Sequence, residues 1–524
     1  EKALPYLPNM ARLVVAEDMA ALTAAGITKD EILRVVAPGG TLCANEGGKW
    51  VATVKPRPKE MDEWTHPHHG PEGNLVSSDK AITFPISLRW LDGVPSDRGG
   101  FGECASCRAV VLAGGRCFTI NTDDLNSEGR ALLRARDAYS GFPLWTVDCQ
   151  GGYGKVELDW RNTWPLAAND RRVYAGRTND VIIVDAASGK IEFTCPTKFR
   201  PWRLLLVGGT AVAACWEKKE MSNPKDAFEN DGIRSVWWPG GEGSLEAIDA
   251  ETGKPKWNLP LSALTIVSGD GLLYVLTHKG NPPSEREVLA VDLASGKEKW
   301  RVPHKTFGEE ADLCLNFAGP GCVVVSKTKS KGPRGAFVLS AADGKVLVNF
   351  TNTVARAIVG DELWCVDGRH NLKTGAKLSG PGLGNTYAGG NGVGGCVPPI
   401  VVGGSLVTGS RGGGYVKYGD DPVKQVTKLS YPGARGACIQ GMVPANGVFY
   451  TAQNNCACFG AQVNGFLCIG PAEEPPSTND FAQPRPVEKG PAFGATGPAA
   501  AADEWPVYRQ NSERSGGVTN PIPD

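Results

Sequence analysis

The amino-acid sequence predicts an all-β fold, an eight-bladed β-propeller, preceded by a short α/β segment. Gly occurs 67 times and Pro 38 times in 524 residues, mostly between short apolar runs, which is typical of tight turns that join short strands. A hairpin motif returns at intervals close to the length of a four-stranded propeller blade. The chain length suits one large repeat architecture with an appendage.

The repeated motif is a strand, a turn of the form Asp-x-x-Ser/Thr-Gly-Lys, and a second strand that ends in an aromatic residue. In one copy, Asp249 caps the turn and Gly253 takes the left-handed backbone conformation that side chains disfavour. Trp257 follows in the second strand, where a large ring fills the wedge between neighbouring sheets. Six copies occur, at residues 134–145, 183–193, 247–257, 290–300, 339–348 and 371–378, and the last two lack the aromatic residue.

Two further units carry weaker versions of the pattern, at residues 395–429 and 438–470, and bring the expected number of blades to eight. Residues 86–90 look like a strand without a hairpin partner of its own. We expect this strand to close the ring as the outer strand of the last blade, because an open ring would expose two unpaired sheet edges.

The regions outside the propeller divide into four parts. Residues 1–57 form the predicted α/β segment, with a strand at 11–18, a helix over 28–36 opened by Thr28 with Glu31 as its capping-box partner, and a turn and strand at 37–43. Residues 58–85 connect this segment to the propeller at 86–470. Residues 471–504 have the Pro- and Ala-rich composition of a linker, and residues 505–524 either begin a second propeller module or pack back on the first.

Charge and hydropathy exclude two classes of partner. The chain has 55 Lys and Arg against 56 Asp and Glu, so it has no basic surface for nucleic acid. No apolar run reaches the roughly 18 residues that a membrane-spanning helix needs, so we expect no transmembrane segment.

The cysteines predict the compartment. The chain has 15 Cys and only 6 His, and close spacings occur at Cys104 and Cys107 and at Cys456 and Cys458. These positions favour disulfide bonds, with Cys438 as a partner for one of the second pair. Because disulfides persist in oxidising compartments, we expect an extracytoplasmic protein of the periplasm or cell envelope.

The motif Ala-x-Asp-x-x-Ser/Thr-Gly-x-x-x-Trp resembles the PQQ-like repeat, which occurs in quinoprotein alcohol dehydrogenases and in BamB-like outer-membrane assembly lipoproteins. Residues 56–70, 431–438 and 443–450 resemble bacterial proteins that fuse a class I methyltransferase-like domain to such a propeller. The resemblance implies that residues 1–57 are the late part of a methyltransferase-like domain. The chain lacks the Gly-rich loop that would hold the methyl donor, so methyl transfer is not expected.

We predict no cofactor. Quinoprotein dehydrogenases of this resemblance carry a vicinal Cys-Cys pair over PQQ, and the chain has none. Covalent haem c needs Cys-x-x-Cys-His, but Arg108 follows Cys107. A metal remains as the alternative, because His66, His68 and His69 lie within four residues and imidazole is a ligand for copper and zinc.

A ligand site is predicted at the mouth of the propeller channel, where loops converge. Its candidate residues are Arg411, Arg435 and Asn446, with Trp237 and Trp238 from a polar insertion. Two guanidinium groups suit a small anionic or saccharide ligand. In the alternative, each Arg binds backbone carbonyl groups of its own loop.

These observations favour a non-catalytic binding or scaffold module of the cell envelope, with a protein partner or a second copy of the chain. Two alternatives stay open. One is a propeller enzyme, an oxidoreductase or a polysaccharide-active enzyme, with its site at the channel mouth. The other is a metal or electron-transfer protein that uses His66–His69. Propellers host many functions, so the fold does not choose among them.

Overall fold

The computed structural model describes residues 3–92, 107–122, 131–149, 165–217, 242–277, 286–308, 312–328, 334–378, 400–403, 405–408, 414–418, 426–430, 441–452, 465–472 and 494. The chain divides into two compact units, Glu1–Glu473 and Glu474–Asp524. All the helices and strands of the described residues belong to the first unit. Most of the predicted linker and all of residues 505–524 lie outside the described residues.

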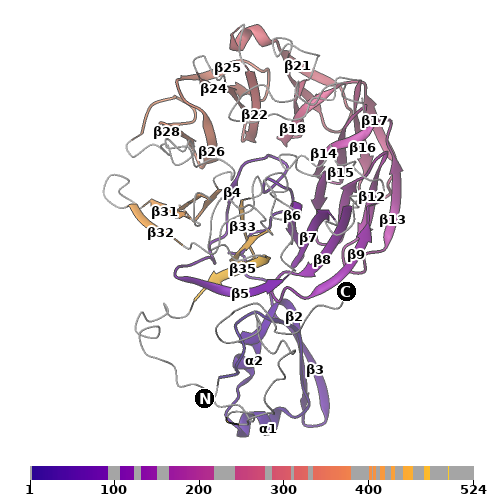
Figure 1. Cartoon of the computed structure of the whole chain (residues 1–524), viewed down its shortest axis with the longest axis vertical. Coiled ribbons are helices and arrows are strands. Elements are labelled where there is room, and N and C mark those ends of the chain that lie inside the picture. Colours follow the sequence, from indigo (N-terminus) through magenta and orange to yellow (C-terminus); the bar gives the residue numbers. More distant parts are fainter. Residues whose placement is uncertain are drawn as a thin grey trace, which may run out of the picture. The chain divides into compact units, whose positions relative to one another are not determined.

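Eight sheets, antiparallel except for one short parallel strand, follow one another along the described part of the chain, and all but two of their strands come after residue 106 (Figure 1). The first three have four strands each. They are β6 (Cys107–Ala113), β7 (Arg116–Thr122), β8 (Ala131–Asp137) and β9 (Pro143–Asp148); β10 (Leu166–Ala168), β11 (Arg172–Gly176), β12 (Asp180–Asp185) and β13 (Ile191–Pro196); and β14 (Arg200–Val207), β15 (Thr210–Trp216), β16 (Gly243–Asp249) and β17 (Pro255–Leu259).

Of the next three sheets, the first two have four strands each, and the third has three in the described residues. They are β18 (Ala263–Gly269), β19 (Leu272–Thr277), β20 (Val288–Asp292) and β21 (Glu298–Val302); β22 (Asp312–Gly319), β23 (Cys322–Thr328), β24 (Gly335–Ser340) and β25 (Val346–Thr351); and β26 (Ala355–Val359), β27 (Glu362–Cys365) and β28 (Gly368–Asn371). A short 3-10 helix, His304–Phe307, follows β21.

The last two sheets take strands from the two ends of the first unit. One joins β29 (Ile400–Val402), β30 (Ser405–Thr408), β31 (Gly414–Tyr418) and β32 (Val426–Ser430) to the short β4 (Val76–Ser77). The other joins β33 (Met442–Ala445), β34 (Val448–Thr451) and β35 (Phe466–Pro471) to β5 (Ile86–Asp92). The predicted β-propeller fold is therefore confirmed, and the weak units near residues 400 and 440 do form sheets.

The repeated turn has the chemistry that the sequence predicted. The Asp185 carboxylate accepts hydrogen bonds from the backbone N and the hydroxyl of Ser188, at 2.7 and 2.5 Å. Gly189 has φ +75°, and a Cβ there would lie 2.7 Å from the ring of Trp145 in the preceding sheet. The indole of Trp145 also donates to the carbonyl of Ala186 at 3.1 Å. A glycine at this position therefore lets one sheet dock its aromatic residue on the next.

The same contact closes the series of sheets. Strand β5 pairs with β35, which confirms that the stretch at 86–90 is the outer strand of the last sheet. From β5, Trp90 packs on Gly141 in the turn between β8 and β9, and its indole donates to the carbonyl of Ala138 at 3.3 Å. An ion pair of 2.6 Å between Arg136 and Asp92 joins the same two sheets.

The N-terminal segment has the strands β1 (Ala11–Ala16), β2 (Val36–Glu46) and β3 (Lys49–Val54), with β1 parallel and β3 antiparallel to β2. Thr28 caps the helix α2 (Lys29–Val35) as predicted, because its hydroxyl accepts from Glu31 N at 3.1 Å. The reciprocal half of the capping box is wrong, since the Glu31 carboxylate binds Leu4 N at 2.6 Å and Arg34 at 2.7 Å.

Two features of this segment differ from the sequence prediction. A second helix, α1 (Met19–Ala24), precedes α2 and is capped by the Asp18 carboxylate. The strand predicted within residues 37–43 is present, but the turn before it is not, because β2 runs through all of these residues. An irregularity in its pairing with β1 accommodates Gly39 at φ +75°. The segment docks on the propeller through Arg12, whose guanidinium pairs with Asp137 at 2.5 Å.

Candidate functional site

The residues that connect the N-terminal segment to β5 form a loop across the propeller sheets. We call residues 62–79 the inner loop. It contacts the first strand of each of the eight sheets, near the end of that strand. The contacts are Trp64 N to Leu112 O at 3.0 Å, Ala168 N to Thr65 O at 3.0 Å, Leu206 N to His66 Nε2 at 2.9 Å, Ser268 N to Pro71 O at 2.8 Å, Ala318 N to Glu72 O at 2.9 Å, Ile358 N to Asn74 Oδ1 at 3.0 Å, Val401 N to Leu75 O at 2.9 Å and Ser77 Oγ to Pro444 O at 3.3 Å.

The two ends of the inner loop are joined by carboxylates. The Asp62 side chain accepts from Ser78 N at 2.7 Å and from Ser77 Oγ at 3.1 Å. Asp79 has no exposed surface and accepts from Asp62 N at 3.1 Å and Gly447 N at 2.8 Å. Burial raises the pKa of Asp79, although these backbone bonds oppose the shift. The loop is thereby closed on itself and fixed to the sheet of β33.

His69 is the charged centre of the inner loop. Its Nε2 lies 2.8 Å from Asp62 Oδ2 and its Nδ1 lies 3.0 Å from Glu72 Oε1. Burial opposes the charged form, but the bonds to both carboxylates outweigh burial and raise the pKa of His69 to about 9. The ring also stands edge-on to Trp64, with centroids 5.1 Å apart. His69 is therefore an imidazolium at neutral pH, and both of its nitrogens are in use.

His66 and His68 differ from His69. His66 is buried, and its Nε2 accepts from Leu206 N at 2.9 Å, so its lone pair is already bonded. Burial, with the nearby charge of His69, lowers the pKa of His66 to about 3, and the ring is neutral. His68 is exposed. The structure thus gives the three histidines of the predicted metal cluster three separate environments.

A hollow of about 290 Å³ lies beside His66. This volume is just below the usual range for ligand pockets, which is about 300–1,000 Å³. Its lining combines the inner loop with turns of two neighbouring sheets. The lining residues are Thr65, His66, Pro71, Ala168, Asn169, Leu206, Gly208, Gly209, Ala250 and Glu251.

Asn446 is the one described member of the predicted channel-mouth site. It lies in the turn between β33 and β34 at φ +57° and is 2% exposed. Its side chain accepts from Arg57 Nη1 at 2.8 Å and donates to Tyr450 at 3.3 Å. These bonds tie the turn to the residues that precede the inner loop. The other members, Arg411, Arg435, Trp237 and Trp238, lie outside the described residues, so the site stays a prediction.

The side chains of the predicted disulfide positions are also outside the described part of the structure. Cys104, Cys438, Cys456 and Cys458 lie outside the described residues, and for Cys107 only the backbone, at the start of β6, is described. Among the described cysteines, the free thiols include Cys43, Cys149, Cys195, Cys215, Cys322, Cys365 and Cys468. Most of them are buried in the sheets, where a thiol packs as a small apolar group.

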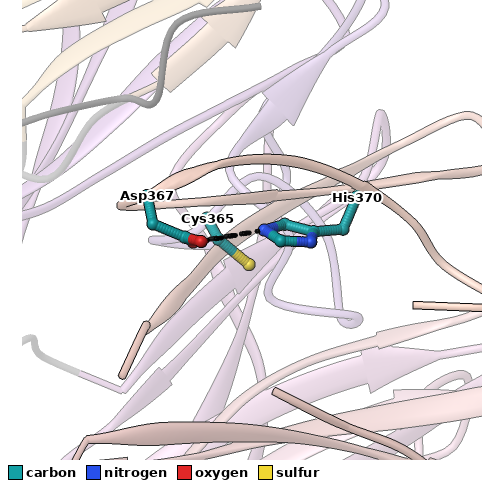
Figure 2. Close-up of side chains that lie close together, drawn as sticks. All are labelled: Cys365, Asp367 and His370. Carbon is teal, nitrogen blue, oxygen red and sulfur yellow. Dashed lines mark hydrogen bonds and ion pairs between the residues drawn. The ribbon is translucent and has the colours of Figure 1, made fainter. Parts of the chain in front are cut away.

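The sequence analysis missed a group of ligating side chains at the hairpin of β27 and β28. Cys365, Asp367 and His370 place a thiol, a carboxylate and an imidazole together, as Figure 2 shows, with their ligand atoms within 4.8 Å of one another. In the described part of the chain, this is the one group of three or more His, Cys, Asp or Glu side chains that could hold a metal ion. The sequence signal was Cys-x-Asp-x-x-His next to a worn repeat copy, which the repeat pattern obscured.

Comparisons with known proteins support the fold. The family model described as outer membrane protein assembly factor BamB matches residues 202–364. A europium-containing methanol dehydrogenase has a similar structure, with a TM-score of 0.50 and 11% identity over 79% of this chain and 99% of that one. No curated protein sequence matches the chain.

Two other solved structures resemble the chain less closely. The quinohemoprotein alcohol dehydrogenase from Comamonas testosteroni has a TM-score of 0.46 and 13% identity, over 79% of this chain and 81% of that one. BamB from Moraxella catarrhalis has a TM-score of 0.41 and 11% identity, over 75% of this chain and 99% of that one. In the described residues, no helix is long and apolar enough to cross a membrane. The chain carries a BamB-like repeat over residues 202–364, in a fold similar to that of the europium-containing methanol dehydrogenase.

Proposed function

We propose that the chain is a non-catalytic binding or scaffold module of the cell envelope that acts through a protein partner. The observation that carries this proposal is the inner loop. His69 binds Asp62 and Glu72 within the loop, and backbone or side-chain atoms of the loop contact all eight sheets. A catalytic acid or base needs a nitrogen or oxygen free for substrate, and His69 has both nitrogens bonded to carboxylates.

The N-terminal segment supports a role in protein binding. Helices α1 and α2 pack on one face of its sheet, against Val14, Leu42 and Ala44. The opposite face, which we call the open sheet face, consists of Leu13, Val15, Trp50 and Val54, and these side chains are 52–61% exposed. Parallel strands normally have both faces covered, and an exposed apolar patch marks an interaction site. We therefore assign the open sheet face to a protein partner with an apolar surface.

The experiment uses the full chain in cells of its source, with a photoreactive amino acid in place of Trp50. We expect a discrete cross-linked protein. The matched control carries the same amino acid at Phe142, which is 69% exposed in the propeller, and should give no such product. Light scattering of the purified protein tells whether the partner is a different protein or a second copy of the chain. If the purified protein is a dimer and Trp50→Ser makes it a monomer, the partner is a second copy. Equal cross-linking at both positions, or none, would contradict the assignment.

The compartment belongs to the same proposal. The BamB family match over residues 202–364 and the paired cysteine spacings support a location outside the cytoplasm. Fractionation of source cells should recover the protein with the envelope. The parallel strand–helix–strand order of β1, α2 and β2 supports the interpretation of residues 1–57 as a methyltransferase-like remnant.

The absorbance spectrum of the purified protein tests the enzyme alternative. A binding module should be colourless and should not oxidise alcohols. A quinone or haem spectrum together with turnover of an alcohol would overturn the proposal.

A further inference from the structure

The register of one hairpin brings a thiol and an imidazole to the same face of a sheet. Cys365 ends β27 and pairs with Gly368, which begins β28, while Leu363 pairs with His370. Side chains alternate along a strand, and paired residues share a face, so Cys365 and His370 are diagonal neighbours on one face. Asp367 occupies the two-residue turn between them and reaches over the same side (Figure 2).

The distances suit a metal ion. His370 Nε2 lies 3.2 Å from each carboxylate oxygen of Asp367, and the Cys365 sulfur belongs to the same group of atoms within 4.8 Å. Zinc binds His nitrogen and Asp oxygen at about 2.0–2.2 Å in tetrahedral geometry, which separates two such ligand atoms by about 3.3–3.5 Å. A small inward shift of the thiol would complete a three-ligand set.

The surroundings hold the ligands in place. Cys365 is fully buried and His370 is 7% exposed, whereas Asp367 faces solvent. The Thr353 hydroxyl donates to Asp367 Oδ1, and Phe350 stands edge-on to the His370 ring with centroids 5.0 Å apart. Nε2 of His370 points at the other two ligands. The solvent side of Asp367 leaves one position open.

We propose that Cys365, Asp367 and His370 bind a divalent transition metal of the zinc class, with water in the fourth position. This site is separate from the inner loop and does not depend on the proposed binding function. Zinc accepts this mixture of sulfur, nitrogen and oxygen ligands, and a softer or harder ion would suit it less well. Burial, with Asp367 nearby, raises the pKa of the Cys365 thiol to about 12, so the free site holds a thiol. Metal binding forms the metal–sulfur bond and releases that proton to water.

Cobalt(II) is the probe, because it replaces zinc and its bond to a thiolate absorbs light. The full-length protein is stripped with a chelator and titrated with Co²⁺. We expect one equivalent to give a thiolate-to-cobalt charge-transfer band, which Zn²⁺ then removes. Cys365→Ser should abolish the band, and Asp367→Asn should weaken Co²⁺ binding at least about tenfold. Thr353→Val, which removes a hydroxyl that orients Asp367, should weaken it about 10–100-fold.

The matched control is Cys322→Ser, which removes another buried free thiol, in β23, and should keep the band. Circular dichroism checks that each variant is folded. If Cys365→Ser does not fold, Asp367→Asn still tests the site, because Asp367 is exposed and its replacement should not disturb the fold. No thiolate band in the wild-type protein would overturn the proposal, as would a band that survives both Cys365→Ser and Asp367→Asn.

Discussion

His69 in the inner loop and His370 in the β27–β28 hairpin both lie against a carboxylate, but the rest of their surroundings differs. His69 has a carboxylate on each nitrogen, at 2.8 and 3.0 Å. His370 has its carboxylate and a thiol on the Nε2 side, and within the described residues its Nδ1 has no hydrogen-bond partner. The first arrangement fixes an imidazolium in an ion-pair network. The second places Nε2 beside two further groups that can ligate a metal.

The difference shows that proximity in the sequence does not determine which side chains form a site together. His66, His68 and His69 are near neighbours in the chain, yet their contacts separate their roles within the loop. Cys365 and His370 are five positions apart and meet because a tight turn sets their register.

Replacement of Trp64 by Ala tests whether the inner loop is structural. Trp64 has no exposed surface and bonds to Leu112 in both directions. The cavity should lower the free energy of unfolding by about 3–5 kcal/mol, measured by urea denaturation. Trp50→Ala, at a side chain that is 52% exposed, is the control and should change it by less than about 0.5 kcal/mol. If both variants lost the same free energy of unfolding, Trp64 would contribute no more to stability than an exposed side chain, and the inner loop would not be structural.

The pH dependence of stability tests the charge on His69. Its pKa is raised to about 9 in the folded protein, so its contribution is complete below the unfolded pKa of about 6.5 and is lost as the pH rises to 9. The free energy of unfolding should therefore fall by about 2–3 kcal/mol over this window. His69→Gln should flatten the curve, and His68→Gln, at the exposed neighbour, should not. A wild-type curve that is already flat would show that the imidazolium is absent.

Zinc should stabilise the hairpin and leave the inner loop unaffected. At a free Zn²⁺ concentration ten times the dissociation constant, binding to the native state adds about 1.4 kcal/mol to the free energy of unfolding. We expect this gain in the wild type and in His69→Gln, but not in Cys365→Ser, with urea denaturation as the measurement. If His69→Gln removed the gain and Cys365→Ser kept it, the metal would belong to the inner loop, and the comparison would be reversed.

Much of the fold was predictable because its turns are local. The turn at Asp185 and Gly189 is encoded within a few residues, and the aromatic contact from Trp145 follows the same repeat. Helix α1 was missed because six residues give too short an apolar pattern, although Asp18 is a good cap. The first part of the strand through residues 37–43 was misread as a turn because Pro and Gly there accommodate an irregular pairing with β1.

The two sites were less accessible to sequence reasoning, for different reasons. The inner loop depends on contacts between backbone atoms that are hundreds of residues apart, such as Leu75 with Val401, and backbone atoms carry no sequence signal. The metal-binding group depends on the two-residue turn that pairs Cys365 with Gly368. That register becomes visible only when both strands are known, because a shift of one residue would turn His370 to the other face.

Lys377 gives the smallest effect and the closest test of the hairpin. Its Nζ lies 3.7 Å from Asp367 Oδ2, and its side chain is 59% exposed. Lys377→Gln should change the free energy of unfolding by no more than about 0.5 kcal/mol, since exposed ion pairs contribute little. Because the ammonium competes with a cation for the same carboxylate, the variant should bind Co²⁺ about threefold more tightly. Lys373→Gln, which removes an exposed charge paired with Asp361, should leave Co²⁺ affinity unchanged. Weaker Co²⁺ binding by Lys377→Gln would instead show that Lys377 orients Asp367 as a ligand. If both variants changed Co²⁺ affinity equally, the change would come from the loss of one positive charge and not from the position of Lys377.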